Sequence, residues 1–126
     1  MKLRVQDNSI RFRLTRAEVD NLHRDGVVSA TVSFPGGSRL EYRVETTALA
    51  GEPQATFSAG ELVVQVPETA MRNWATTEEV SIIGAQPLDG DALSILVEKD
   101  FACLAPREGE DDSDKFPNPL EGHETC

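Results

Sequence analysis

Two stretches of the chain decide its fold. Residues 9–19 read Ser-Ile-Arg-Phe-Arg-Leu-Thr-Arg-Ala-Glu-Val, and residues 61–71 read Glu-Leu-Val-Val-Gln-Val-Pro-Glu-Thr-Ala-Met. In each stretch every second residue is apolar at first, and the apolar spacing then becomes helical. The sequence therefore predicts a half-buried strand that leads directly into a helix at both places.

The first helix is predicted over residues 15–25. Thr15 is a suitable N-cap, and Glu18 completes a capping box three residues later. Val19 and Leu22 lie on one face at helical spacing. These local signals agree, so the sequence predicts a short amphipathic helix that packs on the neighbouring strands.

The second helix is expected to begin at Pro67, because a proline in the first helical position loses no needed hydrogen bond. Its apolar side consists of Ala70, Met71 and Trp74. Further apolar alternation predicts strands near residues 2–6, 28–34, 40–44, 53–58, 80–82 and 93–97, with turns at residues 35–38 and 87–90.

The two halves of the chain align with each other when the sequence is shifted by 52 residues, so that residue 9 meets residue 61. The shift pairs apolar positions of the strands and helices, and it places Pro35 on Pro87 in corresponding turns. The alternative is that any two strand–helix–strand segments share an apolar period. The unbroken phase over strand, helix and next strand favours an internal duplication.

We therefore predict an α+β protein, mostly of antiparallel strands in a barrel or sandwich. It is built from a duplicated strand–helix–hairpin unit with two short helices that cover its open ends. Residues 1–104 form the single domain, with half-units at residues 2–46 and 53–101, and residues 105–126 form an irregular acidic tail.

The charge of the chain restricts its partners. The 126 residues carry a net charge of −10, which disfavours general binding to nucleic acids and anionic membranes. The charge is uneven: five bases and one acid precede residue 17, whereas nine acids and three bases follow residue 97. The net charge makes nucleic acid an unlikely partner, and the uneven distribution raises the hypothesis that the two ends of the chain contact each other.

The sequence also carries signals about location. The first residues lack the apolar core of a signal peptide, and no run of apolar residues is long enough to span a membrane. We expect a cytoplasmic protein without a membrane partner, in which Cys103 and Cys126 are reduced thiols.

One candidate binding site is the cationic face of the first hairpin, formed by Arg4, Arg11 and Arg13. It is most simply a solvated strand face. The alternatives are an anion or nucleic-acid site and an intramolecular site onto which the acidic tail folds, although exposed ion pairs contribute only about 0–1 kcal/mol each.

The tail holds a second candidate binding site. Asp111, Asp112 and Asp114 form an acidic cluster that lacks the ligand spacing of an EF-hand calcium loop. The segment Phe116, Pro117, Asn118 and Pro119 is extended, because each proline disfavours helix in the residue before it. This segment is either a recognition peptide for another protein or a spacer that packs on its own domain.

Metal binding and catalysis have weaker support. Cys103, His123 and Cys126 are ligand types that zinc or another transition metal accepts, but their spacing matches no paired-ligand zinc module. We assign no catalytic residue and predict no cofactor, because no nucleophile, base and nucleotide-binding loop can be identified.

Two resemblances to known families accompany these patterns. Residues 64–82 resemble the swapped-hairpin DNA-binding domains of bacterial transition-state regulators and antitoxins, but the Gly-Asp turn that follows the helix in that family is absent. The chain also resembles a family of small bacterial proteins of unknown function at residues 1–4, 8–15, 18–19, 97–101, 103–104, 111–114 and 116–119. That second resemblance implies an uncharacterised bacterial cytoplasmic protein and assigns no activity.

The function most consistent with the sequence is a non-enzymatic interaction or accessory module whose acidic tail binds or regulates. The alternatives are a small metal-binding protein or enzyme that uses the tail, and a duplicated swapped-hairpin DNA-binding regulator, which the net charge disfavours. The sequence leaves the ligand and the oligomeric state open.

Overall fold

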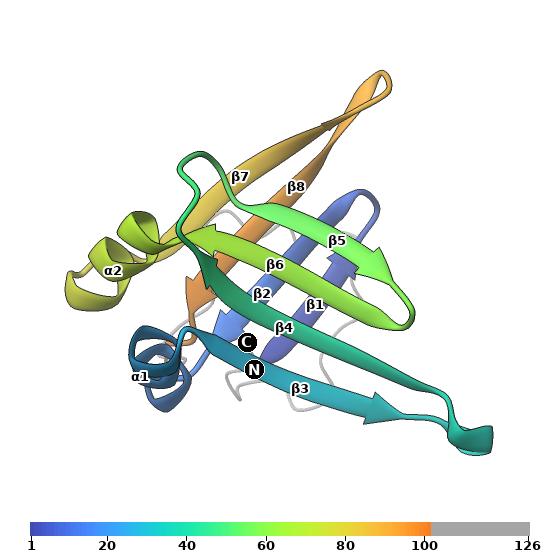
Figure 1. Cartoon of the computed structure of the whole chain (residues 1–126). Coiled ribbons are helices and arrows are strands. Elements are labelled where there is room, and N and C mark those ends of the chain that lie inside the picture. Colours follow the sequence, from blue (N-terminus) through green and yellow to red (C-terminus); the bar gives the residue numbers. More distant parts are fainter. Residues whose placement is uncertain (102–126) are drawn as a thin grey trace, which may run out of the picture.

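Two four-stranded sheets form most of the structure (Figure 1). The computed structural model describes residues 1–101 of the chain. The elements in chain order are β1 (Lys2–Gln6), β2 (Ser9–Leu14), α1 (Arg16–Asp25), β3 (Val27–Ser33), the 3₁₀ turn η1 (Pro35–Gly37), β4 (Arg39–Thr47), β5 (Gln54–Ser58), β6 (Glu61–Pro67), α2 (Glu68–Thr76), β7 (Ser81–Leu88) and β8 (Asp91–Lys99). The predicted α+β class, mostly β with two short helices, is confirmed.

Both sheets are mixed. Sheet A has the order β1-β2-β8-β7, and sheet B has the order β3-β4-β6-β5. The outer pairs of each sheet are antiparallel hairpins, whereas the central pairs, β2 with β8 and β4 with β6, are parallel. The prediction of mostly antiparallel strands holds for the hairpins and missed the two parallel junctions between them.

The hairpins are exchanged between the two halves of the chain. Sheet A joins the β1–β2 hairpin of the first half to the β7–β8 hairpin of the second, and sheet B joins the two remaining hairpins. The parallel registers correspond as well: Ser9 lies opposite Ser94 in sheet A, and Glu61 lies opposite Glu41 in sheet B. Neither half therefore has a complete sheet or core of its own.

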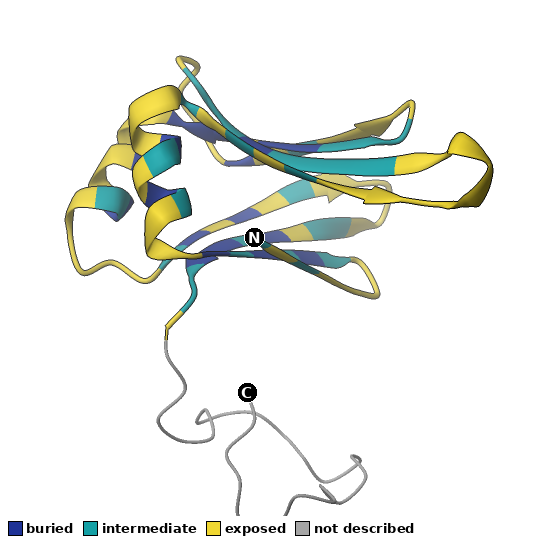
Figure 2. Cartoon of the chain, turned by 90° about the horizontal axis from the view of Figure 1, so that it is seen from below, coloured by how far each residue is buried: buried dark blue, intermediate teal, exposed yellow. Residues whose placement is uncertain are grey.

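The sheets pack face to face as a sandwich, and both helices lie together at one end of it (Figure 2). No strand pairing joins sheet A to sheet B in the described part of the chain, so the barrel alternative does not apply. The expectation that the helices cover two open ends was wrong. The exchange of hairpins brings the two helices side by side, and the hairpin turns form the opposite end.

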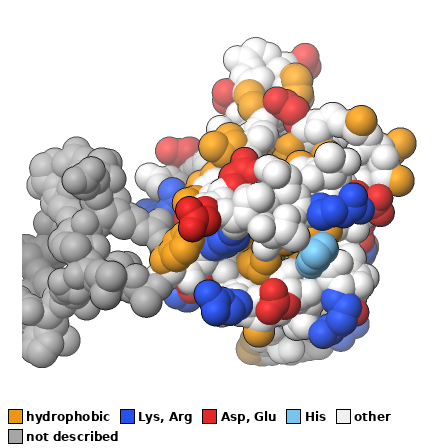
Figure 3. Space-filling model, turned by 90° about the vertical axis from the view of Figure 1, so that its left-hand side faces the viewer, with side chains coloured by type: hydrophobic (Ala, Val, Ile, Leu, Met, Phe, Trp, Pro, Cys, Tyr) orange, Lys and Arg blue, Asp and Glu red, His pale blue; other side chains and the backbone are white. Residues whose placement is uncertain are grey.

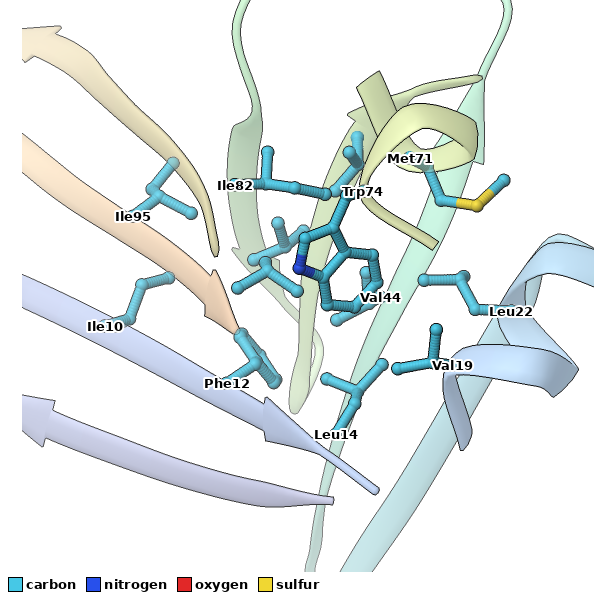
Figure 4. Close-up of a cluster of buried hydrophobic side chains, with 13 residues drawn as sticks. Ile10, Phe12, Leu14, Val19, Leu22, Val44, Met71, Trp74, Ile82 and Ile95 are labelled. Atoms are coloured by element: carbon cyan, nitrogen blue, oxygen red, sulfur yellow. The ribbon is translucent and has the colours of Figure 1, made fainter. Parts of the chain in front are cut away.

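Five of the apolar pairs that the internal alignment matched are buried in both halves. Trp74 is fully buried and lies in the middle of the core, between side chains of α1 and both sheets (Figure 4). Its ring Nε1 donates a hydrogen bond of 2.9 Å to the carbonyl oxygen of Val80. The buried equivalent pairs are Phe12 and Val64, Leu14 and Val66, Val19 and Met71, Leu22 and Trp74, and Val44 and Val97.

The alignment beyond the helices needs a correction. Val27 lies opposite Glu45, and Ser81 lies opposite Glu98, so β7 is shifted from β3 by two more residues than predicted. Pro35 is in η1, whereas Pro87 is inside β7, and the two prolines do not occupy corresponding turns. Pro67 also differs slightly from its prediction, since it ends β6 and caps α2.

The predicted start of α1 is confirmed. Thr15 and Glu18 form the reciprocal capping box, and Gly26 ends the helix in the left-handed conformation at φ 80°. The amino terminus of Met1 donates to Glu18 Oε2 at 2.5 Å, which ties β1 to the helix. Partial burial raises the pKa of Glu18, but hydrogen bonds from the amino terminus and Thr15 outweigh it, so that the pKa is lower than its ordinary value.

Candidate binding face on sheet A

A row of four side chains crosses the outer face of sheet A from one edge to the other. Arg4 lies opposite Arg11, Arg11 opposite Leu96, and Leu96 opposite Ile83. All four point away from the core, because Phe12 and its alternate neighbours on β2 fill the interior. Two arginines are therefore continued by two apolar side chains in a single cross-strand row.

The adjacent row holds an ion-pair network. Arg13 Nε donates to Glu98 Oε1 at 2.7 Å, and Arg11 Nε is 3.7 Å from the same oxygen. Lys2, which lies opposite Arg13, places its Nζ 3.1 Å from Asp100 Oδ2. Glu98 is only 7% exposed, so two arginines hold a carboxylate that is almost removed from water.

The cationic residues of this face outnumber its carboxylates. The face holds the cations Lys2, Arg4, Arg11 and Arg13 against the carboxylates Glu98 and Asp100. Within residues 1–101 Arg4 forms no ion pair. The predicted cationic face therefore exists, and the structure brings Arg4, Arg11 and Arg13 together. Its excess positive charge stands out on a chain with a net charge of −10.

The apolar end of the row borders a shallow hollow of about 380 Å³. Ile83 is 73% exposed beside it and offers apolar surface next to the half-buried Leu96. The hollow is lined mainly by Ser9, Glu52, Ile83, Ala85, Ser94 and Leu96. An extended segment lying across the strands could place acidic groups on the arginines and an apolar side chain here.

Sheet B lacks this combination at its corresponding positions. Gln65 replaces Arg13 and donates to Glu45 at 2.9 Å, in the place of the contact between Arg13 and Glu98. Arg43 lies among carboxylates there, with oxygens of Glu41 and Glu45 at 3.4 Å and of Glu61 at 3.6 Å. The outer face of sheet B is thus locally acidic, and the cationic–apolar row is specific to sheet A.

A second depression lies at the helical end of the molecule (Figure 3). This cleft of about 640 Å³ lies between the C-terminal ends of β2 and β8 and the two helices. Lys99 extends over it, with its Nζ 5.8 Å from the centre of the Trp74 ring and 2.8 Å from the carbonyl oxygen of Thr77. The charged lining residues are Arg16, Asp20, Glu78, Lys99 and Asp100.

This cleft favours neither an anionic nor a cationic ligand, because its lining contains both bases and acids. The lining combines two bases and three acids with the apolar Leu14, Val19 and Ala75, and Lys99 already contacts Trp74 and Thr77. The cleft is therefore a less specific candidate than the face of sheet A, where one sign of charge dominates.

The predicted tail sites lie outside the described residues. These are the acidic cluster and extended segment, Asp111, Asp112, Asp114, Phe116, Pro117, Asn118 and Pro119, and the metal candidates Cys103, His123 and Cys126. Within residues 1–101, no group of three or more His, Cys, Asp or Glu side chains is placed to hold a metal ion.

Sequence reasoning missed Glu98, Leu96 and Ile83 as members of the face. They join it only because β8 pairs in parallel with β2 and β7 then follows β8, and residues 85 positions apart give no local signal of that pairing. The alignment of Glu45 with Glu98 was the one available indication, because a carboxylate recurs there in both halves.

The fold and this face define a class: a small α+β sandwich with exchanged hairpins and one cationic–apolar sheet face. Residues 1–120 match the Family of unknown function (DUF7009), and the chain belongs to that family. No curated protein and no solved structure matches the chain significantly. In the described part of the chain, no helix has both the length and the apolar character that crossing a membrane requires.

Proposed function

We propose that the protein is a non-enzymatic interaction module of the bacterial cytoplasm that binds an acidic, partly apolar segment on the outer face of sheet A. The observation that carries the proposal is the row in which Arg4 and Arg11 continue into Leu96 and the exposed Ile83. Opposite charges fix the orientation of a bound segment, and apolar contact beside them supplies affinity.

The acidic tail is the segment that we assign to this face in the free protein. Asp111, Asp112 and Asp114 match the excess of cations, and Phe116 follows them closely enough to reach the hollow beside Ile83. A partner protein then acts by displacing the tail or by binding the released segment of residues 116–119. In this scheme the tail regulates access to the face.

The internal duplication supports a division of roles between the sheets. The two halves share their order of elements and the register of their parallel pairs, as expected for two copies of one unit. At the copied positions, Arg11 and Arg13 correspond to Val63 and Gln65. In this proposal the two arginines make sheet A the binding face, whereas on sheet B the charge of Arg43 is neutralised by the carboxylates around it.

The test compares two variants of the full chain. One changes Asp111, Asp112 and Asp114 to Asn, and the control removes three other tail charges by changing Glu108, Glu110 and Glu124 to Gln. Amide chemical shifts and hydrogen exchange are measured by NMR over the strands of sheet A.

We expect the Asn variant to shift residues 2–14 and 81–98, and added salt to produce the same change in the wild type. The control variant should leave these signals near their wild-type positions. Signals of sheet A that are identical in all three proteins would contradict tail binding.

A further inference from the structure

Strand β3 forms an edge of sheet B that carries none of the usual protection. Its sequence, Val-Val-Ser-Ala-Thr-Val-Ser over residues 27–33, contains no charge, glycine or proline. Val27 is 42% and Val32 is 41% exposed, and Phe34 directly beyond the strand is 51% exposed. A long, uncharged edge of this kind is a template for another strand.

The other three edges are protected. β1 carries Lys2 and Arg4 on its outer side, and β7 contains Gly84 and Pro87. β5 is shorter, with five residues against seven in β3. Charges, proline and short length are the devices that prevent edge pairing. β3 is therefore the edge at which pairing is expected.

The equivalence of the two halves shows what is missing beside β3. At the β5–β7 side, the Ala55 amide donates to Gln86 Oε1 at 2.9 Å, and Pro53 packs against Gly84 so closely that a Cβ there would lie 2.9 Å from its ring. In the first half, Val32 corresponds to Gln86. In the described part of the chain no matching hydrogen bond links β3 to β1, so this side of the sandwich is not bridged.

We propose that β3 pairs with β3 of a second copy of the chain, antiparallel and centred on Ala30. In this register Val28 meets Val32 on the inner face, and Ser29 meets Thr31 on the outer face. Each copy presents the same pattern to the other, as a two-fold interface requires. The two B sheets then form one continuous sheet, and the exposed Val32 gains an apolar neighbour in Val28 of the other copy.

The second copy fits this edge better than the tail of the same chain does. Pro106, Pro117 and Pro119 remove donors that a paired strand needs, and the acidic residues around them have no opposite charge on β3. A neutral edge also suits self-association. Two chains of net charge −10 repel each other overall, but strand β3 adds no like charges at the contact itself.

The experiment measures the mass and dissociation constant of the full-length protein by sedimentation from micromolar to millimolar concentration. The wild type should reach twice the chain mass of 13.8 kDa. Two double variants differ only at position 29: Ser29→Lys with Thr31→Lys, and Ser29→Glu with Thr31→Lys. Both positions are exposed, so the monomer fold should tolerate the changes.

The proposed register sets residue 29 of one copy against residue 31 of the other. The Lys–Lys variant therefore opposes like charges twice, and the Glu–Lys variant opposes unlike charges twice. We expect the dissociation constants of the two to differ by about tenfold or more at low salt, and this difference to shrink with added salt.

A concentration series of hydrogen exchange on the wild type provides a second measurement that needs no variant. The β3 amides that point away from β4 should become protected only as the dimer forms, whereas the alternate amides already bond to β4 in the monomer. A wild type that stays monomeric at millimolar concentration overturns the proposal. Protection of the outward-pointing β3 amides in the monomer also overturns it, since the tail would then cover the edge. A dimer that responds equally to both double variants also overturns it, since another surface would then hold the copies together.

Discussion

Replacing Glu98 with glutamine removes the carboxylate that Arg11 and Arg13 share. Arg13 donates to it at 2.7 Å, and Arg11 lies 3.7 Å away, so the substitution leaves two guanidinium groups without their common counter-charge. Because Glu98 is only 7% exposed, water replaces the lost charge poorly. We expect the free energy of unfolding to fall by about 2 kcal/mol, near the middle of the range for hydrogen bonds to charged groups.

The matched control is the corresponding change of Glu45 in sheet B. Its side chain is 28% exposed, and its partners are the neutral Gln65 at 2.9 Å and Arg43 at 3.4 Å, which has two other carboxylates nearby. Exposed pairs of this kind contribute about 0–1 kcal/mol. The Glu45→Gln variant should therefore lose about 0.5 kcal/mol or less.

The assay is equilibrium urea denaturation followed by the fluorescence of Trp74, the only tryptophan in the chain. With a typical slope of about 2 kcal/mol per molar, the midpoint should fall by about 1 M for Glu98→Gln and hardly at all for Glu45→Gln. Equal shifts for the two variants would refute the idea that burial and the paired arginines make Glu98 special. An unchanged midpoint for Glu98→Gln would refute the ion-pair network itself.

Three further predictions concern the scaffold. Trp74→Phe should cost about 1–3 kcal/mol in thermal unfolding, because the smaller ring leaves space in the core and the carbonyl of Val80 keeps only one of its two donors, the amide of Lys99. Glu18 stabilises the fold only while its carboxylate is ionised, because its pKa is lower in the folded protein. Its contribution to the free energy of unfolding, measured by urea denaturation at a series of pH values, should be complete above the ordinary pKa of 4.5 and lost as the pH falls through the lower folded pKa. The Glu18→Gln variant should not show this loss. Gly90→Ala should lower the free energy of unfolding by about 1–2 kcal/mol, and Gly60→Ala should lower it further. Both glycines have positive φ, but only at Gly60 would a Cβ meet backbone, at 2.8 Å, and calorimetry of the pair checks this.

Much of the local structure could be predicted because local signals determine it. The capping box at Thr15 and Glu18 and the alternation along β2 and β6 depend on neighbouring residues, and both are present. The two-residue offset of β7 could not be detected in the same way. A strand repeats every two residues, so a shift of two keeps every apolar residue on its face.

The arrangement of the hairpins and the full extent of the candidate face on sheet A could not be predicted from the sequence. The alternation of apolar and polar residues predicts which side of a strand is buried, but it does not predict which hairpin pairs with that strand. The parallel pairing of β2 with β8 therefore had no signal, and with it Glu98 and Leu96 were left out of the cationic face. The arginines were predictable because they share one strand or one hairpin.

The exchange of hairpins also has a consequence for how the chain acquires its structure during synthesis. Ser9 finds its partner in Ser94, so sheet A cannot close until almost all of the described chain has left the ribosome. Contacts this distant in sequence slow folding, and the early hairpins wait with their apolar faces uncovered. The same topology means that the two halves, made as separate polypeptides, should each remain incomplete and fold only when they meet.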